Sequence, residues 1–392
     1  MPPFQVSYRD MAPTPPDQPR PHACWLPDGA TAYARLLEAI GLARVSVRFE
    51  FYIVAPDATG ARFRAALVAA ARRGVRVSVL VDGFGSSSLP NTFWSELLAA
   101  GGSVRVFNPI SWRLFSLRDH RKLVLVDDAV AFVGGFNIAD EYDGDGVSRG
   151  WRDLGLELHS PLVIRPLAAA FDGMFLAAGK SERLVSRLRR LFARRFRGTR
   201  AGPVYLIGPG LGRNRFRADL LRRLRRARHV QLVASYFLPS FRLRRALRQV
   251  ARRGGRVELL LAGRSDVPLV QRAARAGYGP LLRAGIRIWE YEPQILHAKL
   301  AIVDHVVFVG SANLDSRSAG INYEVMVRSH HPELAAAGRA AFAADLTRSR
   351  EITLAAWRAE QTWWTRFRGF CARLLLTRID PWLARAQLRN YS

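Results

Sequence analysis

Lysine is almost absent from this chain. Of its 60 basic residues only three are lysines, Lys122, Lys180 and Lys299, and the rest are arginines. Two of the three stand at equivalent places in a repeated pattern, His-x-Lys-x-x-x-x-Asp. A lysine ammonium is compact and rotates freely, whereas a guanidinium is a flat and rigid fork. The two retained lysines therefore indicate a site that needs the smaller cation.

Cysteines and long apolar runs are also scarce. Cys24 and Cys371 lie far apart without metal-ligand spacing, so we expect free thiols and neither a disulfide framework nor a zinc site. The longest apolar candidate, 162–179, is interrupted by Arg165 and Asp172, which argues against a membrane-spanning helix. Residues 1–25 are rich in proline and lack the apolar core of a secretory signal. We expect a cytosolic protein that reaches a membrane from its surface.

Acidic residues are few relative to basic ones. The 60 basic and 32 acidic residues give a formal net charge of +28. Such a field favours an anionic partner, either nucleic acid or a membrane rich in acidic lipids. A generally arginine-rich proteome would raise the same count, so charge alone does not choose the partner.

The chain is long enough for two domains, and it repeats itself. The segment 71–83 is echoed by 251–263, and the motif beginning at His120 is echoed by the one beginning at His297. A Gly-x-x-Asn element follows each motif, with its asparagine 17 residues after the first histidine and 16 after the second. A shared order with near-equal spacing predicts two copies of one fold.

Each copy alternates helices with continuous Val/Leu runs, which predicts a largely buried mixed sheet covered by helices. In the first copy we predict helices at 31–41 and 60–73 and strands at 44–54, 75–81, 104–107, 122–126 and 129–133. In the second we predict strands at 230–237, 257–262, 286–290, 300–303 and 306–309 and a helix at 241–253. Two α/β sandwiches packed face to face are expected, one over 26–200 with a basic connecting segment and one over 201–355.

Three flanking or linking segments differ from this pattern. Residues 1–25 are expected to be a flexible N-terminus, and the arginine-rich stretch 180–228 has the pattern of a cationic amphipathic helix. Residues 356–392 mix Trp363, Trp364 and Phe367 with arginines, which suits a lipid headgroup interface. The alternative for both basic segments is a helix that packs its apolar residues on the core.

The two motifs carry the chemistry. On a strand, residues i and i+2 point to the same side, so His120 and Lys122 should face one pocket, as should His297 and Lys299. An imidazole that attacks or protonates, with an ammonium that holds phosphoryl oxygens, is a set for handling phosphate.

Asp127 and Asp304 complete the two motifs and are included with the catalytic residues. Their place at the turn after each strand favours bracing the structure or a nearby cation over taking part in the reaction.

The duplicated motif with its Gly-x-x-Asn echo resembles the phospholipase D superfamily over nearly the whole chain. Within it, the chain resembles bacterial cardiolipin synthases of the class without N-terminal transmembrane helices. The stretches that carry this resemblance are 49–53, 80–86, 134–137, 235–239, 310–318, 322–324 and 362–364. The resemblance implies an α/β fold of two pseudo-symmetric α/β/α sandwich lobes with the active site at their interface.

The resemblance also implies a two-step reaction that uses no metal or other cofactor. It makes His120 the nucleophile that forms a phosphohistidine and His297 the acid and base, although the nearly symmetric sequence does not decide between them. The two lysines with Asn137 and Asn313 would stabilise phosphoryl oxygens. Supporting roles fall to Glu141 and Glu324, which would orient the histidines, and to Ser311.

The function that follows is the synthesis of cardiolipin from two phosphatidylglycerol molecules with release of glycerol. A phospholipase D that uses water, a nuclease of the same superfamily and a non-enzymatic membrane-binding protein are the alternatives. The expected partner is an anionic membrane containing phosphatidylglycerol, at the cytoplasmic side of a bacterial inner membrane, and nucleic acid is disfavoured by the Trp/Arg tail. The oligomeric state and the acyl preference stay open.

Overall fold

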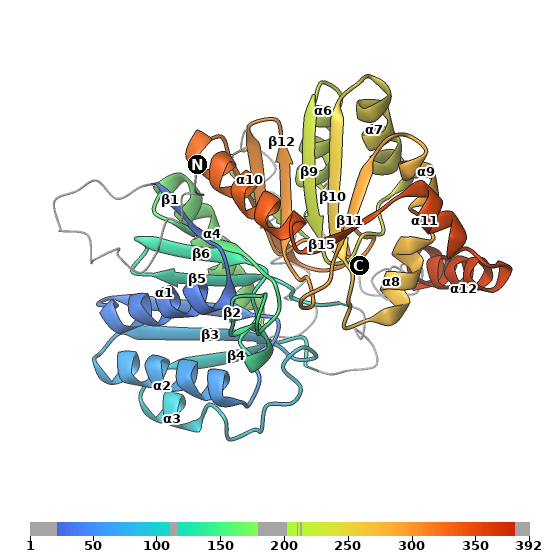
Figure 1. The fold of residues 1–392 in the computed structure, drawn as a ribbon. Helices are drawn as coiled ribbons and strands as arrows, with labels where there is room; N and C mark the ends of the chain where they lie inside the picture. The colour runs from blue at the N-terminus through green and yellow to red at the C-terminus, as the bar shows by residue number, and fades with distance from the viewer. Residues whose placement is uncertain (1–21, 110–116, 179–201, 210, 212–213, 381–392) are drawn as a thin grey trace.

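The chain forms two lobes, each built on one mixed β-sheet (Figure 1). This computed structural model describes residues 22–109, 117–178, 202–209, 211 and 214–380. Among the described residues, no helix is both long and apolar enough to cross a membrane. Cys24 and Cys371 are both free thiols, as expected.

The first lobe has a seven-stranded sheet in the order β1-β7-β6-β5-β2-β3-β4. Its strands are β1 (Ala23–Leu26), β2 (Ser46–Phe51), β3 (Arg76–Asp82), β4 (Ser103–Phe107), β5 (Lys122–Val126), β6 (Val130–Gly134) and β7 (Gly155–Leu158). Helices α1 (Gly29–Leu42) and α2 (Ala58–Arg72) bury their apolar faces on one side of this sheet. The short α3 (Ser95–Ala99) and the 3-10 turn η2 (Asp140–Tyr142) lie in connections.

The second lobe has an eight-stranded sheet in the order β15-β11-β10-β9-β12-β13-β14-β8. Its strands are β8 (Val204–Ile207), β9 (His229–Ala234), β10 (Arg256–Ala262), β11 (Arg287–Tyr291), β12 (Lys299–Val303), β13 (Val306–Gly310), β14 (Glu324–Ser329) and β15 (Ser349–Ile352). Its helices include α6 (Arg215–Leu224), α7 (Phe241–Arg252), α8 (Pro268–Arg275), α9 (Gly279–Leu282) and α11 (Leu354–Ala359). Read from β8, the order repeats that of the first lobe with β15 added, which confirms the predicted duplication.

The two sheets face each other across a shared apolar layer. Leu123, Leu125 and Val133 of the first lobe belong to the same buried cluster as Leu300 and Val309 of the second. Helix α4 (Pro161–Ala177) lies on the first sheet and contacts β8, while α10 (Pro332–Leu346) lies on the second sheet and contacts β1. Each lobe therefore supplies one helix to the contact between them.

The elements predicted from periodicity are present, with ends shifted by a few residues, and β5 has the predicted bounds. The sequence reasoning missed the short strands β1, β7, β8, β14 and β15, whose four to six residues are too few for a clear alternation. Strand β1 begins at Ala23, inside the segment expected to be flexible. In the basic stretch, residues 180–201 fall outside the described residues, while α6 packs Phe216, Leu220 and Leu224 into the core.

Candidate active site

Both motifs begin where the two lobes join. His120 lies two residues before β5, and its backbone N–H donates to the carbonyl of Tyr323 in the second lobe at 2.9 Å. His297 lies two residues before β12, and its N–H donates to the carbonyl of Arg152 in the first lobe at 2.8 Å. Each contact is part of an isolated parallel bridge, Asp119 with Tyr323 and Arg152 with Leu296. The backbone itself therefore holds both motifs at the lobe interface.

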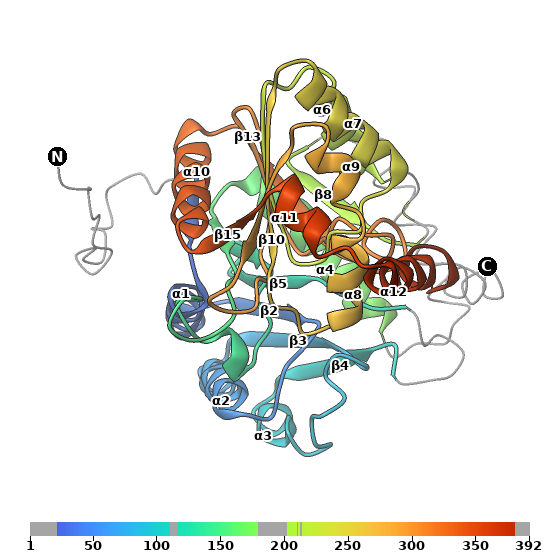
Figure 2. The ribbon, with the colours of Figure 1, turned by 45° about the vertical axis from the view of Figure 1, so that its right-hand side comes forward.

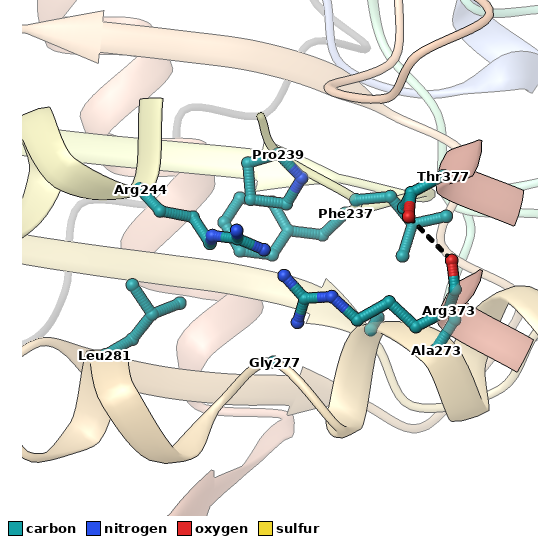
Figure 3. Close-up of a pocket in the computed structure, with 10 residues that line it drawn as sticks. Phe237, Pro239, Arg244, Ala273, Gly277, Leu281, Arg373 and Thr377 are labelled. Carbon is teal, nitrogen blue, oxygen red and sulfur yellow. Dashed lines mark hydrogen bonds between the residues drawn. The ribbon is translucent and has the colours of Figure 1, made fainter. Parts of the chain in front are cut away.

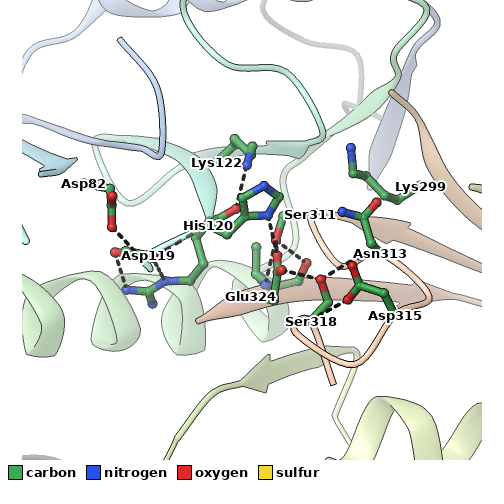
Figure 4. A network of polar contacts seen from close by, with 12 residues as sticks. Asp82, Asp119, His120, Lys122, Lys299, Ser311, Asn313, Asp315, Ser318 and Glu324 are labelled. Carbon is green, nitrogen blue, oxygen red and sulfur yellow. Dashed lines mark hydrogen bonds and ion pairs between the residues drawn. The ribbon is translucent and has the colours of Figure 1, made fainter. Parts of the chain in front are cut away.

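Each histidine is held by a carboxylate from the opposite lobe. His120 Nδ1 lies 3.0 Å from Glu324 Oε2, at the start of β14 (Figure 4). His297 Nδ1 lies 2.6 Å from Asp153 Oδ2, two residues before β7. Because β7 and β14 occupy equivalent places in the two sheets, the arrangement is pseudo-symmetric: each lobe supplies the carboxylate that contacts the histidine of the other lobe.

Glu324 thus lies where an orienting carboxylate was expected, but Glu141 does not. Glu141 is exposed on η2, and Asp153 occupies the position against His297. The sequence repeat did not reveal Asp153, because it is an aspartate where the second lobe has a glutamate. The spacing also differs, since Asp153 lies 16 residues after Asn137, whereas Glu324 lies 11 after Asn313. The longer first-lobe loop that contains η2 accounts for the difference in spacing.

The carboxylates fix the state of both imidazoles. A carboxylate only accepts hydrogen bonds, so each Nδ1 carries the proton and each Nε2 keeps its lone pair. Burial lowers the pKa of His120, and it lowers the pKa of His297 to about 4, although the carboxylates act in the opposite direction. Both imidazoles are therefore neutral at neutral pH, ready to attack phosphorus or to accept a proton.

The two carboxylates stay ionised despite their burial. Burial by itself would raise the pKa of Glu324, but its pairing with His120, the charge of Lys122 and the hydrogen bond from Ser311 hold it below its usual value. For Asp153 burial likewise raises the pKa, and His297 with Lys299 more than offsets it. Each acid is thus paired with the histidine and the lysine of a motif.

Glu324 is fixed by two serine hydroxyls. Ser311 Oγ donates to Oε2 at 2.6 Å and Ser318 Oγ donates to Oε1 at 2.7 Å. Ser311, predicted as a supporting residue, is fully buried and acts on Glu324 directly. At the equivalent place in the first lobe stands Gly135, where a Cβ would lie 2.2 Å from Asp153 Oδ1. The glycine is required because the shorter acid occupies that space.

Both motif lysines are buried, with 2% of each residue exposed. Lys122 Nζ donates to the carbonyl of His120 at 2.8 Å, and Lys299 Nζ donates to the carbonyl of His297. Burial lowers the pKa of Lys122 to about 7 and that of Lys299 to about 8. The charge of Lys299 also lowers the pKa of Lys122, which shows that the two ammoniums lie near each other. A bound phosphodiester would offset this repulsion.

The asparagines of the Gly-x-x-Asn elements contact protein groups. Asn137 is buried, and its Oδ1 accepts from the N–H of Ile53 at 3.2 Å while Nδ2 donates to the Tyr142 hydroxyl at 2.7 Å. The Tyr142 ring lies 5.2 Å from the His297 ring, so Asn137 positions an aromatic side chain that neighbours that histidine. Asn313 Oδ1 accepts from Ser235 Oγ at 2.7 Å. The first asparagine is thus a positioning residue and differs from the expected phosphoryl donor.

Asp127 and Asp304 lie at the far ends of β5 and β12 from the lysines. Asp127, with φ of 55°, accepts the backbone N–H groups of Arg44, Val45 and Ser46. Asp304, with φ of 54°, accepts those of Arg228 and His229. Each aspartate comes five positions after its lysine, a span of about 17 Å at ~3.4 Å per residue of strand. Counting them as catalytic was wrong, and bracing the turn is their observed role.

No group of three or more His, Cys, Asp or Glu side chains is arranged to hold a metal ion in the part of the chain that the structure describes. A small cavity lies away from the histidines, where Arg373 and Thr377 approach Phe237, Pro239 and Ala273 (Figure 3). No motif residue lines it.

Comparison with known proteins shows which family the chain belongs to. The family profile described as "Cardiolipin synthase, PLD-like domain" matches residues 36–175 and 220–346. The chain is 34% identical over 320 residues to cardiolipin synthase B of Escherichia coli, covering 78% of this chain and 75% of that protein. It is 31% identical over 355 residues to the major cardiolipin synthase of Bacillus subtilis, covering 89% and 73%.

A crystal structure of phosphatidylserine synthase from Haemophilus influenzae matches with a TM-score of 0.71 at 12% identity, covering 93% of this chain and 95% of that one. At that identity the likeness concerns the fold alone. Together with the sequence relatives, the duplicated lobes and the paired motifs lead to one assignment. This protein belongs to the cardiolipin synthase family of phospholipase D-like enzymes.

Proposed function

We propose that the protein makes cardiolipin by transferring the phosphatidyl group of one phosphatidylglycerol molecule to a second one, with release of glycerol. The observation that carries this proposal is the pair of neutral histidines, each oriented by a carboxylate of the opposite lobe, with two buried lysines near each other. The similarity to proteins named cardiolipin synthases supports the choice of lipid.

The first step forms a covalent intermediate. Nε2 of one histidine attacks the phosphorus, a P–N bond forms, and the P–O bond to the glycerol headgroup breaks. The other histidine donates the proton that the leaving glycerol oxygen needs. The negative charge of the bound phosphodiester favours protonation of that second imidazole, whose pKa burial otherwise lowers.

The second step reverses these roles. A hydroxyl of the incoming phosphatidylglycerol gives its proton to the acid/base histidine, its oxygen bonds to phosphorus, and the P–N bond breaks. We assign His120 as the nucleophile and His297 as the acid and base. His297 suits the second role because its pKa, lowered to about 4, leaves it neutral and able to accept that proton. Lys122 and Lys299 stabilise the charge on the phosphoryl oxygens in both steps.

Access to the bilayer is proposed to come from α12 (Trp363–Leu374). One side of this helix buries Gly369 and Ala372 against lobe 2, at α8. Its other side exposes Trp363, Trp364 and Phe370, which are 74%, 49% and 62% accessible. Figure 2 shows the helix projecting beside α8, away from the two sheets. The helix also carries Arg366, Arg368 and Arg373.

Aromatic and cationic side chains on one helix suit a headgroup layer that is rich in anionic lipid. We therefore propose peripheral attachment through α12 to the cytoplasmic face of a membrane containing phosphatidylglycerol.

The test is incubation of the purified protein with phosphatidylglycerol vesicles, followed by mass spectrometry of the lipids and an assay of free glycerol. Cardiolipin and glycerol in equal amounts are expected, and acid-quenched protein should carry a phosphatidyl adduct on a histidine. Phosphatidic acid as the main product would establish the hydrolase instead. Unchanged lipid together with cleavage of plasmid DNA in a parallel tube would establish the nuclease.

A further inference from the structure

Transfer to a second phospholipid brings two phosphodiesters into the site at once. The transferred phosphoryl group is held by the His-Lys motifs, but the acceptor lipid carries its own phosphate, separated from the attacking hydroxyl by a glycerol unit. Water and simple alcohols bring no such charge. An enzyme that favours a lipid acceptor therefore benefits from a second cationic place close to the histidines.

Such a place lies beside His120. The Tyr52 ring is 4.9 Å from the His120 ring, and Lys122 Nζ lies 5.1 Å from the centre of the Tyr52 ring. Arg118 hydrogen-bonds to Tyr52, and its guanidinium carbon lies 3.9 Å from the centre of the Phe84 ring. Arg118 thus continues the line of cationic and aromatic groups outward from the catalytic histidine.

Arg317 reaches the same place from the second lobe. It belongs to the loop that also supplies Ser318, which donates to Glu324. Its Nε lies 3.3 Å from Asp380, while its Nη1 is buried and finds no hydrogen-bond partner among the described residues. The charge of Arg317 acts on both Tyr52 and Arg118, so these groups are close. A buried cationic donor without an acceptor is costly, and the nearby charge of Arg118 adds to this cost until an anion binds both groups.

The other half of the pseudo-symmetric site lacks these cations. By the repeat, Arg118 corresponds to Ile295, Arg317 to Glu141 and Tyr52 to Ser235. The side of His297 is instead lined by aromatic rings, with Tyr142 at 5.2 Å and Trp151 at 5.6 Å. A second phosphate therefore has one cationic place, on the side of His120, rather than two equivalent ones.

Carboxylates near the two arginines cancel this charge only in part. Burial raises the pKa of Asp82, beside Arg118, to about 7, and it raises that of Asp315, beside Arg317, to about 6. Asp82 is thus partly protonated near neutral pH, whereas Asp315 is mostly ionised. Asp380 contacts Nε of Arg317 and leaves Nη1 for another acceptor.

We propose that Arg118 and Arg317 form an anion subsite beside His120 that holds the phosphodiester of the acceptor lipid during the second step. This inference rests on the proposed phosphatidyl transfer. It adds the residues that make the covalent intermediate react with a lipid acceptor rather than with water. Guanidinium groups suit the role because their planar forks match two phosphate oxygens at once.

The test is a competition between two acceptors for one intermediate. Phosphatidylglycerol micelles are mixed with ethanol, which is neutral, and the ratio of cardiolipin to phosphatidylethanol is measured by mass spectrometry. Both products come from the same covalent intermediate, so the ratio does not depend on the donor step. In Arg317→Gln the ratio should fall about tenfold or more, as for loss of a hydrogen bond to a charged group. Phosphatidylethanol formation should stay close to wild type, which also reports correct folding.

Two matched variants sharpen the outcome. Arg317→Lys keeps the charge and should recover part of the ratio. Arg72→Gln removes one positive charge at an exposed site on α2 and should leave the ratio unchanged. A ratio that is unchanged in Arg317→Gln overturns the subsite, as does an equal fall of both products. Inorganic phosphate that lowers the wild-type ratio at concentrations below that of the lipid would assign the site to free phosphate and overturn the lipid assignment. If the wild type forms neither product, the proposed function itself fails.

Discussion

Replacing Asp153 with asparagine should remove the basicity of His297 while leaving the fold intact. Asp153 Oδ1 accepts the backbone N–H of Leu154 at 2.8 Å, and Oδ2 faces His297 Nδ1 at 2.6 Å. A backbone N–H can only donate, so the amide oxygen of an asparagine must stay on Leu154. Its NH2 group must then face His297. That histidine would carry its proton on Nε2, the nitrogen that has to accept one.

The expected loss follows from this change of tautomer. A catalytic histidine held in the wrong tautomer by an Asp-to-Asn change loses about 10⁴ in kcat in the serine protease case, and weaker orienting effects are about 10–100-fold. We expect a loss of at least about a hundredfold. Glu324→Gln should be milder, because its partners Ser311 and Ser318 are hydroxyls that can rotate from donor to acceptor. The amide oxygen can therefore remain on His120.

Cardiolipin formation from phosphatidylglycerol is the assay, with thermal unfolding to show that each variant is folded. Glu141→Gln serves as the control, since Glu141 is exposed and should give near-wild-type turnover. If Asp153→Asn keeps more than about a third of the wild-type rate, or if Glu324→Gln loses more than Asp153→Asn does, the assignment of tautomers is wrong.

The remaining predictions concern the lysines and the tail. Lys122→Arg and Lys299→Arg should each lower turnover about a hundredfold or more, because the larger fork replaces a buried ammonium; near-wild-type rates would contradict the need for lysine. In the wild type, kcat/KM should rise as the histidines, whose pKa is lowered, lose their protons. It should fall again as pH passes about 7 to 8, where Lys122 and Lys299 lose theirs. If the activity that remains in Lys122→Arg falls at the same alkaline pH as in the wild type, Lys122 does not cause that fall. Trp363→Ala with Trp364→Ala should weaken binding to anionic vesicles in a salt-dependent way yet spare a short-chain soluble substrate, and unchanged sedimentation with vesicles would exclude α12 as the anchor.

The sequence by itself determined the duplication and the four motif residues. Two copies of His-x-Lys at strand positions i and i+2 fix which side chains share a pocket, because alternation along a strand is a local property. The run of Val and Leu around each motif predicted the central strands β5 and β12 for the same reason.

Tertiary structure alone decided which groups act on those residues. The carboxylate on His120 comes from 204 residues away and that on His297 from 144, across an interface that no local pattern encodes. Asp153 therefore replaced Glu141 in the second pairing, and the motif aspartates Asp127 and Asp304 proved to brace distant turns. The difference between the two sides of the site, with Arg118 and Arg317 meeting only beside His120, likewise exists only once the lobes are joined, because each lobe supplies one arginine.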